Sequence, residues 1–99
     1  MTDAELHAYW PDLATVIAQL RRADRPAVAE ALVDAVRAGA TSSEILGGVG
    51  VVLREHRALR SVIGAAGVRA WDAVMADVNR AFPVSRLARW VARLTRRSN

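Results

Sequence analysis

Residues 41–53 read TSSEILGGVGVVL, and this stretch carries the strongest local signal in the chain. Thr41 and Glu44 form a capping box, in which a hydroxyl and a carboxylate exchange hydrogen bonds with backbone amides that a helix N-terminus leaves unpaired. We therefore predict a helix that begins here and ends near Arg60 or Ser61. Its apolar stripe comprises Ile45, Val49, Val52, Leu53, His56 and Leu59.

The chain before this stretch predicts an N-terminal helix with a proline inside it. Thr2 and Glu5 repeat the capping-box spacing. Pro11 removes a backbone hydrogen bond, so it either kinks the helix near Trp10 or breaks it and takes the first position of the main helix. The apolar stripe of this segment comprises Leu6, Trp10, Leu13, Ile17 and Leu20.

A second helix is expected between the first one and the capping box at Thr41. Asp24 is the expected N-cap, Pro26 fits the first turn, and Gly39 should end the helix in a left-handed conformation. The inward face comprises Val28, Leu32, Ala35 and Val36.

Two helices are predicted on the C-terminal side, after a connection over residues 61–67. The first carries apolar residues three and four positions apart, and Pro83 stops it. This stripe comprises Val68, Trp71, Met75, Val78 and Phe82. The second covers residues 83–99, and its apolar arc comprises Val84, Leu87, Val91 and Leu94.

Together these segments indicate an all-α fold. Ninety-nine residues, of which 53% are hydrophobic, can bury one core but not two. We expect a single compact domain over residues 1–99, built of about five short helices. Short connections favour either an antiparallel bundle or an orthogonal array, and periodicity does not choose between them.

Several functional classes are disfavoured by composition. The chain has no cysteine, which excludes disulfides, thiolate metal sites and cysteine nucleophiles. No uncharged apolar run reaches eighteen residues, and the N-terminus is acidic, so we expect neither a spanning helix nor a signal peptide. His7 and His56 are the only histidines, and no catalytic or metal-binding grouping is visible. We expect a non-enzymatic cytoplasmic protein without metal or cofactor.

Three glycines inside the helix that starts at residue 41 need a compensating reason, because each costs about 1 kcal/mol relative to alanine. They are Gly47, Gly48 and Gly50. One interpretation is a backbone left open for the approach of a ligand or partner. The other, which we favour, is that a neighbouring helix crosses so closely that no side chain fits.

The positive charge of the chain is concentrated at its C-terminus. All fourteen cationic residues are arginine, and residues 83–99 contain five of them and no acid, whereas residues 1–82 have a net charge of −1. On a helical projection these arginines lie opposite the apolar arc, with Trp90 between the two. The candidate partner-binding residues are Arg86, Arg89, Trp90, Arg93 and Arg97.

The leading functional hypothesis is a non-catalytic protein-binding module for a partner with an acidic surface, of the inhibitory, adaptor or bacterial immunity and antitoxin-like type. Nucleic-acid binding through the C-terminal arginines is the first alternative. Contact of the same helix with an anionic membrane surface is the second. A homodimer through exposed apolar surface also fits the composition.

Overall fold

The computed structural model describes residues 2–82, and these form an all-α domain with a single core. The described elements in order are α1 (Asp3–Tyr9), α2 (Pro11–Arg22), α3 (Pro26–Ala38), α4 (Ser42–Glu55), the 3₁₀ helix η1 (Arg57–Val62) and α5 (Gly64–Ala81). The predicted C-terminal helix over residues 83–99 lies outside the described residues.

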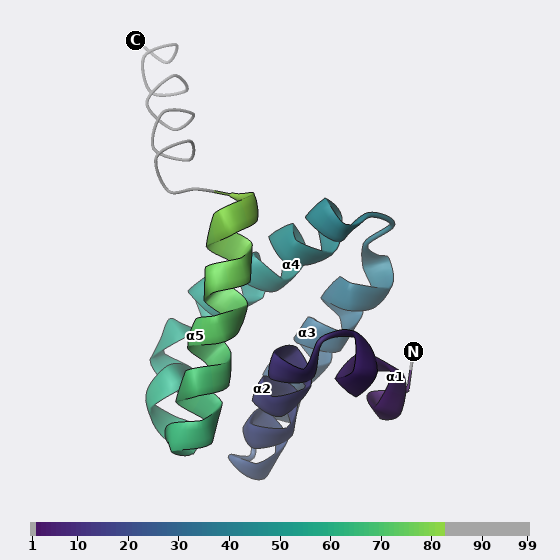
Figure 1. The fold of residues 1–99 in the computed structure, drawn as a ribbon. Helices are drawn as coiled ribbons and strands as arrows, with labels where there is room; N and C mark the ends of the chain where they lie inside the picture. Colours follow the sequence, from purple (N-terminus) through teal and green to yellow (C-terminus); the bar gives the residue numbers. More distant parts are fainter. Residues whose placement is uncertain (1, 83–99) are drawn as a thin grey trace, which may run out of the picture.

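Figure 1 shows how the helices are arranged. The helices α3 and α5 run antiparallel to α2, which packs against both of them, while α4 lies obliquely and contacts α3 and α5. The short helix α1 folds back on α2. The arrangement combines an antiparallel set with one oblique helix, so it lies between the two architectures left open by the sequence.

The core is formed largely by the predicted apolar stripes. Leu13, Leu20, Leu32 and Val49 have no exposed surface, and Val16 and Val74, which lie outside the predicted stripes, are equally buried. Among residues 2–82 every buried side chain is hydrophobic, and no buried polar or charged side chain is present. Burial of a Val or Leu side chain stabilises a fold by about 1.5–3 kcal/mol, so this core supplies the main favourable contribution to packing of the helices.

Pro11 breaks the first helix, which was one of the two predicted outcomes. The chain ends α1 at Tyr9 and restarts α2 with Pro11 in its first position. Trp10 joins the two with φ −145° and ψ 79°, and its backbone N–H still donates to the carbonyl of Leu6. The break lets α1 turn back on α2 while Leu6 and Trp10 both stay buried.

Two predicted caps of α3 are wrong. The N-cap is Arg25, because Asp24 has a φ of +59° and forms part of the tight turn that follows α2. Gly39 ends the helix in an extended conformation, with φ −77° and ψ 127°. It is needed for a different reason, since a Cβ at this position would lie 2.5 Å from Cγ1 of Ile45.

The predicted C-terminus of α4 and the start of α5 are also corrected. The helix α4 ends at Glu55, so His56 is its half-buried C-cap and does not belong to the stripe. The tighter η1 follows and allows Ile63 to enter the core, where it is 2% exposed. Gly64, with φ +73°, then redirects the chain into α5, which therefore begins inside the predicted connection.

Candidate functional site

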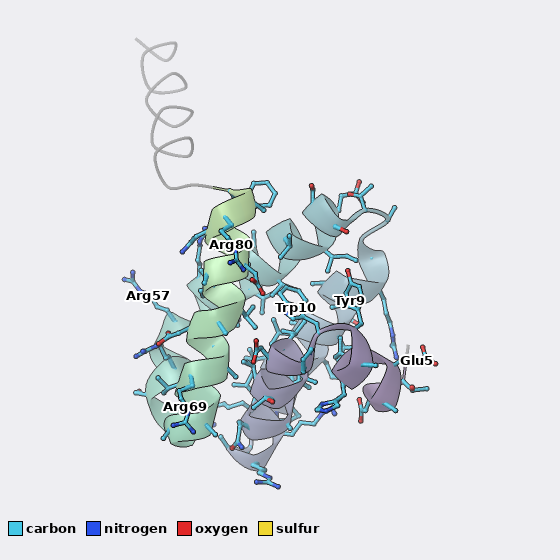
Figure 2. The ribbon with its side chains drawn as sticks, viewed as in Figure 1. Glu5, Tyr9, Trp10, Arg57, Arg69 and Arg80 are labelled. Atoms are coloured by element: carbon cyan, nitrogen blue, oxygen red, sulfur yellow. The ribbon has the colours of Figure 1, made fainter. Side chains whose placement is uncertain are left out.

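An open groove lies where three parts of the chain meet: the junction of α1 and α2, the first turn of α4 and the last turn of α5. Its volume is about 480 Å³, which is within the usual range of binding clefts. Its lining residues are Tyr9, Trp10, Ser42, Ile45, Leu46, Asp77, Arg80 and Ala81. Figure 2 shows Tyr9 and Trp10 at the α1–α2 junction and Arg80 on α5.

The helix break at Pro11 positions the aromatic side of the groove. Trp10 is 9% exposed and directs its indole Nε1–H to Oδ2 of Asp77, at 3.2 Å. The other oxygen of Asp77 accepts a hydrogen bond from Arg80. Since both carboxylate oxygens are engaged, Asp77 serves to hold Trp10 and Arg80 in place. Tyr9 is 56% exposed at the rim.

The capping residues of α4 position the opposite wall. The Thr41 hydroxyl accepts a hydrogen bond from the backbone N–H of Glu44 at 3.2 Å, as the sequence predicts. The Glu44 carboxylate accepts one at 2.7 Å from the N–H of Ala40, the residue before the N-cap. These bonds fix the first turn, and with it the half-buried Ile45 and Leu46 that line the groove.

The three glycines of α4 face three different neighbours. A Cβ on Gly50 would lie 2.7 Å from Cγ1 of Val78, and one on Gly48 would lie 3.3 Å from the Cβ of Ala35. At Gly47 the nearest atom would be Cζ of Phe82, at an ordinary 3.6 Å. Close approach of α5 thus explains Gly50 and close approach of α3 explains Gly48, while Gly47 has room for a methyl group.

The candidate residues of the C-terminal segment are Arg86, Arg89, Trp90, Arg93 and Arg97, and all of them lie outside the described residues. The structure does show where the chain leaves α5. Arg80 and Ala81 line the groove, and Phe82 lies against Gly47 on α4. The segment that follows Phe82 therefore starts at the rim of the groove.

Acidic residues of the domain pair with several arginines of residues 2–82. Arg21 contacts Asp3 at 3.4 Å and Glu30 at 3.2 Å. Arg60 donates two hydrogen bonds to Asp72, at 2.8 and 2.7 Å. This bidentate pair, mainly through its hydrogen bonds, lowers the pKa of Asp72 below its ordinary value and raises that of Arg60.

Within residues 2–82, no group of three or more histidine, cysteine, aspartate or glutamate side chains could hold a metal ion. None of the helices in residues 2–82 has the length and hydropathy that a membrane crossing requires.

Comparison of the chain with protein families, with curated proteins and with solved structures finds no match. The site is therefore interpreted from its own geometry.

The groove was not predicted from the sequence, although two of its residues carried a signal. Ile45 and Trp10 each belong to a predicted stripe. Trp10 lies in the core and Ile45 packs against it, as predicted, and both also line the groove. Tyr9, next to a tryptophan and a helix-breaking proline, is the residue that could have indicated an exposed aromatic rim. Asp77 and Arg80 carried no such signal.

Proposed function

We propose that this domain is a non-catalytic module that binds an acidic surface of a partner protein through the arginines of residues 83–99. The observation that carries the proposal is the division of charge. Residues 83–99 contain five arginines and no acid, whereas residues 1–82 contain nine arginines and ten acids. Inside the described domain, Arg21, Arg60 and Arg80 pair with its own carboxylates.

The place where the chain leaves α5 supports the same proposal. Arg80 lies at the rim of the groove, and its side chain is 76% exposed although it pairs with Asp77. The exposed ring of Tyr9 borders the same groove. Arginine and tyrosine are enriched in the energetically important parts of protein interfaces, so this end of the molecule has a suitable composition for contact with a partner.

A protein partner is favoured over nucleic acid by the charge of the rest of the domain. A nucleic acid extends past its first contact, and residues 1–82, with a net charge of −1, offer no net positive charge to attract its phosphates. An acidic protein patch can be as small as the arginine segment itself. We place the protein in the cytoplasm, since small secreted domains without cysteine are uncommon, and we expect it to inhibit, neutralise or tether its partner.

The test is affinity capture from an extract of the native cell, with two variants of equal charge. Arg89→Glu with Arg93→Glu reverses charge in the proposed contact. Arg57→Glu with Arg69→Glu makes the same change on exposed residues that Figure 2 shows on the opposite side from Tyr9.

We expect the wild type and the Arg57/Arg69 variant to retain one protein in stoichiometric amount. The Arg89/Arg93 variant should bind it at least tenfold more weakly, or about 1.4 kcal/mol. Equal retention by both variants would move the contact elsewhere. Binding of mixed oligonucleotides at low salt, or sedimentation with anionic vesicles, with the same dependence on Arg89 and Arg93 and no protein partner, would replace the proposal with one of its alternatives.

A further inference from the structure

The groove has an apolar wall on α4 that residues 2–82 leave uncovered. Ile45 and Leu46 form its α4 wall and are only half-buried, and Tyr9 at its rim is 56% exposed. Its one carboxylate, Asp77, already accepts hydrogen bonds from Trp10 and Arg80. The charge of that carboxylate is thus already partnered by Arg80, and the aliphatic wall of Ile45 and Leu46 suits apolar side chains.

The chain itself continues from the edge of this groove. Phe82 has φ −130° and ψ 76° and ends α5, as expected of a residue that precedes a proline. Its ring lies 3.6 Å from the position of a Cβ on Gly47, the residue next to Leu46 in the α4 wall. The next residues therefore begin beside the wall that they would cover.

Residues 83–99 have the pattern that such a groove requires. At helical spacing they present an apolar arc on one side and arginines on the other. The arc comprises Val84, Leu87, Val91 and Leu94. The arc would supply aliphatic side chains to pack against Ile45 and Leu46. The arginines would stay in water, where a charged group has no desolvation cost.

The short connection decides between this segment and other occupants. A site joined to its ligand by a few residues sees it at an effective concentration in the millimolar range. A second copy or a partner at micromolar concentration would have to bind about a thousandfold more tightly to displace it.

We propose that the apolar arc of residues 83–99 docks in the groove of its own chain and thereby holds the arginines outward. The docked arc completes the core between α4 and α5 and fixes the orientation of Arg89 and Arg93. For the role of those arginines this inference rests on the proposed function, but docking itself requires no partner.

Disulfide trapping tests the docking directly, because the chain has no cysteine of its own. The test pair is Leu46→Cys with Leu87→Cys. The control pair replaces Leu46→Cys by Val51→Cys, on the same helix but 52% exposed and outside the groove lining. A further pair, Ser42→Cys with Val91→Cys, uses an exposed rim position, so that a loss of core packing at Leu46 cannot decide the result.

We expect at least one of the two groove pairs to form a disulfide within the monomer at least tenfold faster than the control pair, without any partner. Equal rates for all pairs would overturn the docking. Disulfides that link two copies would also overturn it and would assign the groove to a second chain. Failure of partner capture together with rapid trapping would refute only the proposed function, which keeps the two results separate.

Discussion

The two halves of α5 differ in what covers them. In the first half, Ala70 and Trp71 are at most 5% exposed, enclosed by the other helices of the domain. In the last turns, Asp77, Arg80 and Ala81 line an open groove. The same amphipathic helix thus closes the core at one end and borders an open groove at the other. The difference separates the residues that determine the fold from those available for contact.

The largest expected effect is at the closed half. Trp71→Ala should lower the free energy of unfolding by about 3–5 kcal/mol, because it leaves a cavity in the core. Tyr9→Ala, at the open end, should change it by no more than about 0.5 kcal/mol, since the ring is 56% exposed. Urea denaturation of the two variants measures the contrast. Similar losses would mean that the groove is as much part of the core as Trp71 is.

Two glycines of α4 sharpen the comparison, because they differ in the space beside them. Gly50→Ala should destabilise the domain by about 1–2 kcal/mol. The new Cβ would clash with the stiff side chain of Val78, and the cost of this clash exceeds the gain in helix propensity from glycine to alanine. Gly47→Ala should stabilise it by about 0.5–1 kcal/mol, because the Phe82 ring leaves room. Thermal denaturation of both proteins gives the signs. Stabilisation by Gly50→Ala would show that α4 and α5 are farther apart than described.

The hydrogen bond between Trp10 and Asp77 connects the groove to the core. Asp77→Ala should lower the free energy of unfolding by about 1 kcal/mol, because the partly buried indole N–H loses its acceptor. Asp77→Asn keeps a carbonyl oxygen at the same place and should cost less. Denaturant titrations followed by tryptophan fluorescence compare the two. If both variants cost the same, the ion pair with Arg80 would be the important interaction instead.

The smallest expected effect is the acid dependence of the Arg60–Asp72 pair. Since the pKa of Asp72 is lowered in the folded state, its contribution is complete above the ordinary aspartate pKa and is lost as the pH falls through the lowered value. The melting temperatures of the wild type and Asp72→Asn should therefore differ slightly at pH 7 and converge in acid. The pair is exposed, so the difference should shrink with added salt. A difference that persists at pH 2 would contradict this assignment.

The parts of the fold that depend on residues close together in the sequence were predictable from the sequence. The hydroxyl caps of Thr2 and Thr41 bond their predicted amides, and the predicted stripes through Leu13, Leu32 and Val78 lie in the core. The boundaries at Asp24, Gly39 and His56 were predicted wrongly. At these positions the conformation depends on contacts with the following segment. At Gly39, for example, the backbone and side chain of Ile45 leave no space for a Cβ atom.

The groove depends on distant residues and could not be read from local patterns. Trp10 belongs to one predicted apolar stripe, whereas Leu46 and Asp77 belong to none, so no local pattern indicates that the three residues meet. Only their arrangement shows that α4 and α5 diverge at this end and leave space. The arginines of residues 83–99 remain a prediction from charge and spacing, to which the structure adds the place where their segment begins.

The most direct test of this account uses the two tryptophans of the described domain as reporters. The indole N–H resonance of Trp10 reports on the groove, and that of Trp71, which is 4% exposed, reports on the closed core. In the 99-residue chain, Leu87→Asp should shift the Trp10 resonance and leave that of Trp71 in place, while Arg89→Glu should shift neither. A Trp10 resonance unchanged by Leu87→Asp would contradict the account.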